Sequence, residues 1–483
     1  MTLGSAINSA LSGLSMASRS TLTIASNVAN ATTDGYARRE LEIVSRDSTR
    51  GSPGVRVVTE NRILDAGLLG ERRRTDAAMA EASTRADALF RLESAFGVPG
   101  EPGALVTRVG QFEAALIEAA SRPDSLSRLD TVLREAQGLA GDIASLGRLV
   151  QDGRTAADAE LEAEVARLNA GLAEVHRLNS LIQREIATGQ VPNGLKDQRQ
   201  RVIDELADLV PLREVERPGG RVVLFTDNGG ILLDGKPALI EVTSLGRPLE
   251  PGTVLPSGDS ALLINGVPIP EGPGGILSGG RIEALFSVRD KLLPDAQNRL
   301  DTLAADLISR FSEAEQNSPV PQAPASGGLF IDTNPPATDP MVGLSQRLGV
   351  VALQPGANGD VWRLRTGLGE LVDPGFPGDG RGIDALATAL QSFTNLGIGG
   401  GAARDFSAHV ADLASGIGRS RDGAEVQLAS ASARNTALRE SEAGFGVDTD
   451  AEMQRLLVIE RLYAANARVL TAADEMMQRL LAI

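Results

Sequence analysis

The two ends of the chain carry its most regular pattern of apolar positions. Apolar or small residues recur there at alternating spacings of three and four, which is typical of a coiled-coil seam. The N-terminal series is Leu3, Ile7, Ala10, Leu14, Ala17, Thr21, Ile24 and Val28, and the C-terminal series is Leu456, Ile459, Tyr463, Asn466, Leu470, Ala473, Met477 and Leu480. The pattern predicts one long helix at each end.

Neither seam has an evident partner in the adjacent sequence. We therefore predict that the two terminal helices, each about 40 Å long, pair with each other and form the assembly interface. Asn466 is a polar position within the C-terminal seam, and such a residue can fix the register of two helices. Periodicity alone leaves a second interpretation open, in which each helix is an ordinary amphipathic helix packed on its own domain.

The interior of the chain is predicted to be mainly helical. Apolar residues repeat with helical spacing over several long segments, which indicates a helical bundle. These segments are residues 62–97, 104–121, 125–150, 161–186, 282–311 and 383–442. Because proline lacks a backbone N–H, Pro294 is expected to kink or divide the helix in which it lies.

Two interior segments differ from this helical pattern. After Pro211, Val222 and Leu224 alternate with polar neighbours, and three turn dipeptides follow, so a small β region is predicted there. The dipeptides are Asn228-Gly229, Asp234-Gly235 and Asn265-Gly266. Residues 313–345 are rich in proline, alanine, serine and asparagine and are expected to be irregular, whereas residues 349–372 around Trp362 are expected to be β-like.

The predicted fold class is mainly α with β insertions. It comprises paired terminal coiled-coil helices, an elongated helical-bundle domain and small β domains inserted in the middle. Paired ends require the chain to leave and return on one side, so both termini are expected at one pole of an elongated molecule. The predicted domains are residues 1–35 plus 450–483 (a terminal coiled-coil, or inner tube, domain), 36–211 plus 278–312 plus 380–449 (the helical bundle), 212–277 (an inserted β domain) and 313–379 (an irregular, β-containing insertion).

Composition excludes several classes of function. A chain of 483 residues is expected to have more than one core. Its formal net charge of -16 opposes binding to nucleic acid. It has no cysteine, which excludes disulfides and thiolate metal sites. No run approaches the roughly 20 apolar residues of a membrane span, and the first residues lack the features of a secretory signal.

Candidate catalytic and metal-binding residues are few. His176 and His409 are the only histidines. Neither has a second ligand at metal-binding spacing or a catalytic-triad context, so both are expected to be solvated or packed. The residues Gly397, Gly399 and Ala402 match a degenerate dinucleotide fingerprint, but the preceding segment is helical and a loop between helices is the better interpretation.

No catalytic residue, cofactor or metal is therefore predicted, and the chain is not expected to be an enzyme. The densest basic run, Arg72 to Arg74, is expected to be solvated, because three consecutive residues cannot share one helix face.

Residues 25–36, ASNVANATTDGY, resemble the N-terminal signature shared by flagellar rod, hook and hook-associated proteins. The signature follows Ser12-Gly13-Leu14, as it does in that family. Asp34 stands where hook-associated relatives commonly have proline, and Asp-Gly also supports a turn. The positions that carry the resemblance are Asn27, Ala29, Asn30, Thr33, Gly35 and Tyr36.

Residues 448–480 are similar to the C-terminal signature of the same family. The matching positions are Arg461, Ala465, Asn466 and Ala467, and Glu460 replaces the glutamine usual before that arginine. Within the family the long interior helices resemble those of hook-associated proteins, because a hook protein is expected to be mainly β. Another axial structural protein, of the hook or distal rod, and an axial protein with an enzymatic insertion remain alternatives.

The resemblance implies a structural adapter at the hook–filament junction that polymerises through its terminal helices. It also implies export without a cleaved signal peptide. The implied partners are further copies of the chain in a ring, the hook protein, hook-associated protein 3, and an export chaperone on the C-terminal helix.

Overall fold

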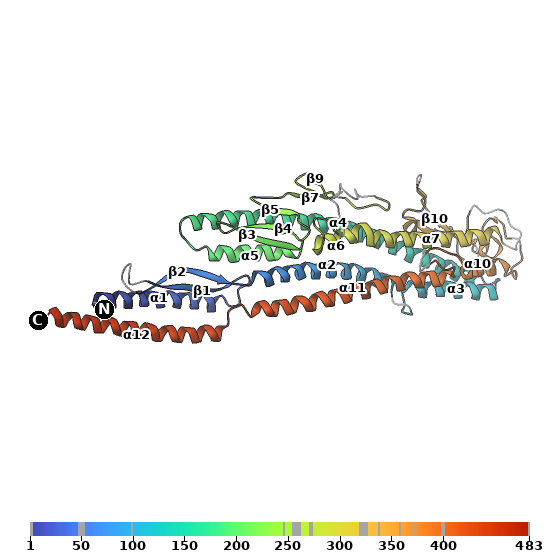
Figure 1. Cartoon of the computed structure of the whole chain (residues 1–483). Coiled ribbons are helices and arrows are strands. Elements are labelled where there is room, and N and C mark those ends of the chain that lie inside the picture. The colour runs from blue at the N-terminus through green and yellow to red at the C-terminus, as the bar shows by residue number, and fades with distance from the viewer. Residues whose placement is uncertain are drawn as a thin grey trace.

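The molecule is elongated, with the two chain termini close together at one end (Figure 1). The structure is a computed structural model that describes residues 3–46, 54–97, 100–244, 247–253, 262–269, 274–317, 327–336, 339–356, 359–370, 372–373, 375–397 and 401–481. The predicted fold class, mainly α with β insertions and paired terminal helices, is confirmed.

The terminal helices α1 (Leu3–Ala29) and α12 (Thr449–Leu481) lie side by side and antiparallel (Figure 1). Alanine and glycine fill much of their contact, since Ala10, Gly13, Ala17 and Ala473 are buried. Asp448 starts α12, because its Oδ1 accepts hydrogen bonds from the backbone N–H groups of residues 450 and 451. Small seam residues let the two helices approach closely.

A β-hairpin follows α1 and packs on it. Strands β1 (Arg38–Arg46) and β2 (Gly54–Ile63) pair antiparallel, with a register shift between Glu42 and Ile43. The predicted helical-bundle domain begins at residue 36 and includes this hairpin, whose two strands the sequence did not predict; the division into domains stays a prediction. Leu41 and Ile43 alternate with glutamates, a period of two that fits a strand with one exposed face.

Long helices build the body of the molecule. Helix α2 (Ala66–Phe96) begins at Asp65, whose side chain accepts hydrogen bonds from two backbone N–H groups of its first turn. It runs beside α11 (Phe406–Ala443), and α4 (Leu126–Ala187) extends for 62 residues, about 90 Å. The other long helices are α3 (Leu105–Ser121), α5 (Asn193–Ala207), α7 (Leu293–Gln316) and α10 (Arg381–Gln391).

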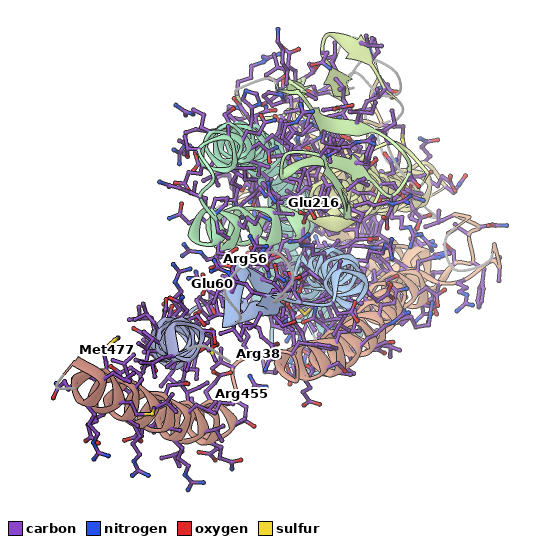
Figure 2. All side chains as sticks on the ribbon, turned by 60° about the vertical axis from the view of Figure 1, so that its left-hand side comes forward. Arg38, Arg56, Glu60, Glu216, Arg455 and Met477 are labelled. Carbon is purple, nitrogen blue, oxygen red and sulfur yellow. The ribbon has the colours of Figure 1, made fainter. Side chains whose placement is uncertain are left out.

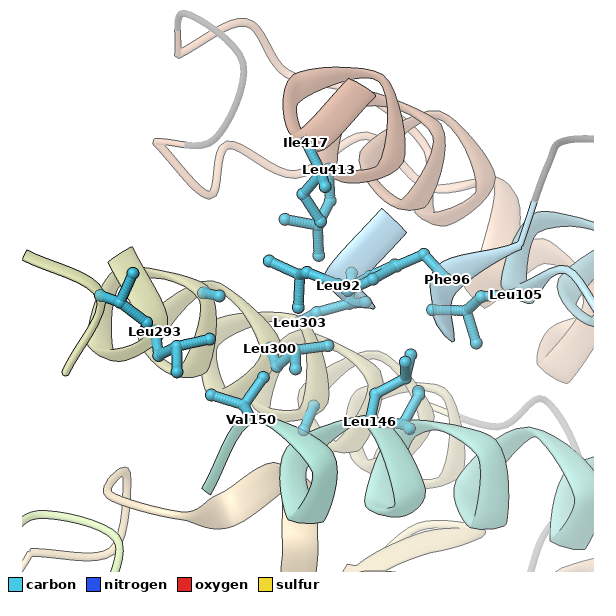
Figure 3. Close-up of a cluster of buried hydrophobic side chains, with 14 of the residues drawn as sticks. Leu92, Phe96, Leu105, Leu146, Val150, Leu293, Leu300, Leu303, Leu413 and Ile417 are labelled. Atoms are coloured by element: carbon cyan, nitrogen blue, oxygen red, sulfur yellow. The ribbon is translucent and has the colours of Figure 1, made fainter. Parts of the chain in front are cut away.

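A continuous apolar core joins these body helices. Figure 3 shows leucine, valine, isoleucine and phenylalanine side chains from α2, α3, α4, α7 and α11 packed together. Phe112, Phe311 and Phe330 form an aromatic cluster with ring centroids 5.0 to 5.8 Å apart. Among the described residues, this core contains none of those in α1, α12 or the hairpin.

The β insertion lies where the turn dipeptides predict it. One antiparallel sheet contains β3 (Leu212–Arg217), β4 (Arg221–Thr226), β5 (Ile231–Asp234) and β6 (Lys236–Pro237), and a second contains β7 (Ile240–Val242), β8 (Leu262–Ile264) and β9 (Val267–Pro268). Asn265 and Gly266 have φ of 54° and 76°, which closes the two-residue turn between β8 and β9.

Pro294 divides a helix, as predicted. Helix α6 (Gly280–Ser287) continues into a π-helical segment, η1 (Val288–Leu292), and Pro294 lies in the first turn of α7. A proline is tolerated there because its missing N–H would find no partner within the helix. The widened turn therefore ends one helix and starts the next.

The segment around Trp362 is not β-like, contrary to the prediction for residues 349–372. Strand β11 (Leu348–Val350) pairs with β10 (Phe330–Asp332), and α8 (Leu344–Arg347) and α9 (Arg363–Thr366) are single helical turns. Asp360 accepts hydrogen bonds from the N–H groups of Gln354 and Arg363. These local bonds turn the chain back on itself and compete with strand pairing.

Candidate assembly interface

The predicted interface residues fall into three groups by exposure. Those facing the partner helix are buried or half-buried, whereas three on α12 remain open to solvent. Ile24 is buried, Leu3, Ile7, Leu14, Val28, Leu456, Ile459, Asn466 and Leu470 are half-buried, and Tyr463, Met477 and Leu480 are exposed. Their role in assembly stays a prediction.

Gly13 of α1 packs directly against the side chain of Asn466 of α12. A Cβ atom on Gly13 would lie 2.6 Å from Asn466 Nδ2, closer than van der Waals contact allows. Asn466 Nδ2 also donates to the backbone carbonyl of Leu462, 3.0 Å away. The glycine of the Ser12-Gly13-Leu14 motif therefore has a packing role.

The surface of α12 carries an exposed apolar face. Only Glu452 and Ala473 are buried among the described side chains of this helix. The exposed apolar side chains are Met453, Leu457, Val458, Leu462, Tyr463, Val469, Met476, Met477 and Leu480, at 41% to 67% of their full exposure. Many exposed apolar side chains along one helix are typical of a protein–protein interface.

Asn27 connects the end of α1 to the start of the hairpin. Its buried side chain donates from Nδ2 to the backbone carbonyl of Arg39 at 2.9 Å. Its Oδ1 accepts from the Arg39 N–H at 3.0 Å and from the Tyr36 hydroxyl at 2.8 Å. Burial raises the pKa of Tyr36, so this hydroxyl stays a donor. Three hydrogen bonds thus explain a central asparagine in the N-terminal motif.

The other motif positions have different environments. Gly35 has a φ of 74°, and a Cβ atom there would lie 2.3 Å from Arg201 Cγ. Asn30 Nδ2 donates to the Ser26 carbonyl at 2.8 Å. Ala29 and Thr33 are exposed, as are Arg461 and Ala465 of the C-terminal motif, whereas Ala467 is half-buried.

Asp197 of α5 holds the hairpin against the helical body. Its Oδ1 accepts from Arg62 Nε at 2.8 Å, and its Oδ2 accepts from Arg39 Nη2 at 3.0 Å. Gln200 Oε1 accepts from Arg62 Nη2 at 2.6 Å, and Asn193 Nδ2 donates to the carbonyl of Glu60. The sequence did not predict these contacts between α5 and the hairpin, because an acidic residue in an amphipathic helix carries no distinguishing signal.

Glu452 makes a second connection between the hairpin and α12. This buried carboxylate lies 3.0 Å from Arg455 Nη1 and 4.0 Å from Arg38 Nη1. Figure 2 shows Arg38 and Arg455 near each other, between the hairpin and the start of α12. The start of α12 is therefore joined electrostatically to β1.

Arg72 and Arg73 are buried, so the prediction of a solvated basic run is wrong for both. Arg72 pairs with Asp76, Asp204 and Glu442 at 2.7 to 2.8 Å, and Arg73 pairs with Asp204. Each buried guanidinium has carboxylates from other elements beside it, which offset its loss of water. Burial raises the pKa of Glu442, and the two arginines oppose that shift. Arg74, the third residue of the run, is exposed.

No group of three or more His, Asp or Glu side chains that could hold a metal ion occurs in the part of the chain that the structure describes. His409 is buried, with Nε2 2.9 Å from the carbonyl of Thr394, and His176 is half-buried. Thr394 and Arg404 form an isolated bridge that closes the loop containing Gly397, and Gly399 lies outside the described residues. None of the described helices is both long and apolar enough to cross a bilayer.

Comparison with known proteins gives two family matches. Residues 89–318 match the flagellar hook-associated protein FlgK helical domain. Residues 443–483 match the flagellar basal body rod FlgEFG protein C-terminal domain. The first match covers much of the helical body with its β insertion, and the second covers α12 and the connection before it.

Two similar proteins from different bacteria carry the same name. Flagellar hook-associated protein 1 of Bacillus subtilis (strain 168) is 24% identical over 503 residues, covering 95% of this chain and 94% of that protein. The protein of the same name from Salmonella typhimurium is 25% identical over 64% of this chain, and the match spans 56% of its length.

A solved structure, of the flagellar hook junction protein FlgK from Burkholderia pseudomallei, is 22% identical. It has a TM-score of 0.42, with 54% of this chain and 46% of that chain covered.

The paired terminal helices and the two family matches define a structural protein of the bacterial flagellar axis. The match along almost the whole chain narrows the class further. The chain is similar to flagellar hook-associated protein 1 along almost its whole length, and residues 89–318 match the helical domain of that protein.

Proposed function

We propose that this chain joins the hook to the filament and polymerises through α1 and α12. The observation that carries the proposal is the apolar face of α12, which packing against α1 leaves exposed. Covering apolar surface stabilises association by about 25 cal/mol per Å². Neighbouring α1–α12 pairs arranged around an axis would cover this face and form the inner wall of a tube.

The proposed partners follow from the position at a junction. Copies of the chain form a ring, the hook protein lies on one side of it, and hook-associated protein 3 lies on the other. Before assembly the apolar face of α12 would be exposed to water, and an export chaperone would bind and shield it. Export proceeds without a cleaved signal peptide, and the role is structural without catalysis.

The proposed division into domains assigns each part a task. Residues 1–35 and 450–483 form the inner tube. Residues 36–211, 278–312 and 380–449 make lateral contacts, with the hairpin at their start. Residues 212–277 and 313–379 are insertions that leave the tube unchanged.

Electron microscopy of cells that produce a chain truncated after Asp448 tests this function. We expect hooks without filaments and flagellin lost to the medium, because α12 is absent. Normal filaments would contradict the proposal, and loss of hooks as well would move the protein inward to the rod or hook.

A pair of substitutions distinguishes the role of the apolar face from the role of helix α12 as a whole. Leu462→Glu with Val469→Glu places two charges on the apolar face of α12 and should also block filaments. The matched control is Ile231→Glu with Leu239→Glu, at similarly exposed apolar positions of the β insertion. The control should leave filaments intact.

A further inference from the structure

A groove lined by arginines lies along the contact between α1 and the hairpin. It has a volume of about 400 Å³ and an apolar floor that includes Leu11 and Val57. Arg19, Arg46 and Arg56 line it, and none of the described residues in its wall is acidic. None of the three arginines forms an ion pair with another residue in the described ranges. All three are exposed.

This groove differs in charge from the rest of the chain. The chain has a net charge of -16, and many of its arginines pair with carboxylates, as Arg39 and Arg62 do at Asp197. Three like charges around one cavity repel one another and attract an anionic partner. The groove is therefore complementary to a surface that carries carboxylates beside apolar side chains.

The last turns of α12 present such a surface. Asp474 and Glu475 are exposed and form no ion pair with another described residue, and Met477, three positions after Asp474 on the same helix face, is 41% exposed. Within one chain these turns do not reach the groove. Figure 2 shows Arg56 on the hairpin and Met477 of α12 on different sides of α1.

We propose that the groove binds the acidic end of α12 from a second copy of the chain. Asp474 of one copy would pair with Arg19 of the next and Glu475 would approach Arg56, while Met477, on the same helix face as Asp474, covers Leu11. The inference rests on the proposed self-assembly and adds its direction, because the α12 end of each copy meets the hairpin side of its neighbour.

Charge reversal and charge exchange test the inference. In cells producing Arg19→Glu with Arg56→Glu, we expect the number of filaments per cell to fall more than about tenfold, because like charges would then face each other. Adding Asp474→Arg with Glu475→Arg to the same chain should restore filaments, since every copy then carries both halves of the exchanged pair. The control Arg134→Glu with Arg148→Glu makes the same charge change on exposed positions of α4 and should have no effect.

The possible outcomes differ from those of the proposed function. Normal filaments with the reversed arginines would overturn the inference, while the chain truncated after Asp448 still reports on the junction role. Loss without restoration would also overturn it, because the groove would then bind a different protein. Circular dichroism of the purified variants confirms folding, and the neutral pair Arg19→Gln with Arg56→Gln serves if the reversed chain does not fold.

Discussion

At the scale of single residues, Gly13 sets the spacing of the terminal helices. Its missing side chain makes room for Asn466, so a glycine is tolerated in mid-helix although it costs about 1 kcal/mol relative to alanine. Asn466 lies within a seam of mostly apolar residues, where one polar side chain can fix register. Gly13 and Asn466 thus allow close packing of α1 and α12 and favour one register between the two helices.

Gly13→Ala should weaken assembly although alanine favours helix. The new methyl group would force Asn466 aside or separate α1 from α12, an overpacking that costs typically 1–3 kcal/mol. Counting filaments per cell measures the effect. Gly4→Ala is the matched control in the same helix, because a Cβ atom at Gly4 meets nothing within 4 Å. Equal filament numbers in the two variants would contradict a packing role for Gly13.

Glu81 gives a pH-dependent prediction. Burial raises the pKa of Glu81, Glu283 adds to the shift, and Arg85 opposes it. A carboxyl group with a raised folded-state pKa binds its proton more tightly when folded. Its contribution to stability is therefore full below the unfolded pKa of about 4.3 and is lost as pH rises through the folded pKa.

Glu81→Gln removes this loss. The variant should match the natural chain near about pH 4, where the carboxyl is protonated, and should melt a few degrees higher near about pH 8. Thermal unfolding followed by circular dichroism at both pH values measures the difference. A variant that is less stable at the higher pH would show that the charged form is favourably paired.

At the scale of elements, apolar periodicity predicts the long helices because it is local. The seams of α1 and α12 and the spacing in α4 repeat within a few residues, so the sequence displays them directly. The hairpin of residues 38–63 was missed, since its alternation is short and charged residues occupy one face.

Ionic contacts between elements could not be predicted from the sequence. Arg73 pairs with Asp204, 131 positions away, and Asp197 with Arg62, 135 positions away. No spacing rule connects such residues, and nothing in a single sequence distinguishes an ion-pairing aspartate in α5 from its neighbours. The motif residues were found through resemblance, and only the fold shows that Asn27 bonds to the Arg39 backbone.

Helix α1 should be weakly ordered in a free monomer. Its seam faces one partner helix, and the core of the body includes none of its residues, so few contacts offset the entropy of ordering. Hydrogen–deuterium exchange should show fast exchange at residues 5–28 in monomers and slow exchange after assembly, with α4 protected in both. Strong protection of residues 5–28 in a proven monomer would contradict this prediction.

At the scale of the whole molecule, polar contacts join two units of different character. The body has a continuous apolar core, whereas the hairpin is held to α5 by Asp197, Gln200 and Asn193. Because the hairpin carries α1, and Glu452 joins it to α12, this joint sets the direction in which both terminal helices leave the body. An ionic joint is weakened by salt, unlike an apolar one.

Asp197→Asn should loosen that joint without unfolding the body. The amide removes the negative charge between Arg39 and Arg62, so the two guanidinium groups repel each other across the joint.

The chain lacks cysteine, so spin labels at Glu40→Cys on the hairpin and Ser145→Cys on α4 report one distance by pulsed electron paramagnetic resonance. We expect a narrow distance distribution in the parent chain and a broad one in the variant. Asp142→Asn, which removes an ion pair with Arg108 inside the body, should leave it narrow. An unchanged distribution in Asp197→Asn would mean that contacts other than these ion pairs fix the direction of the terminal helices.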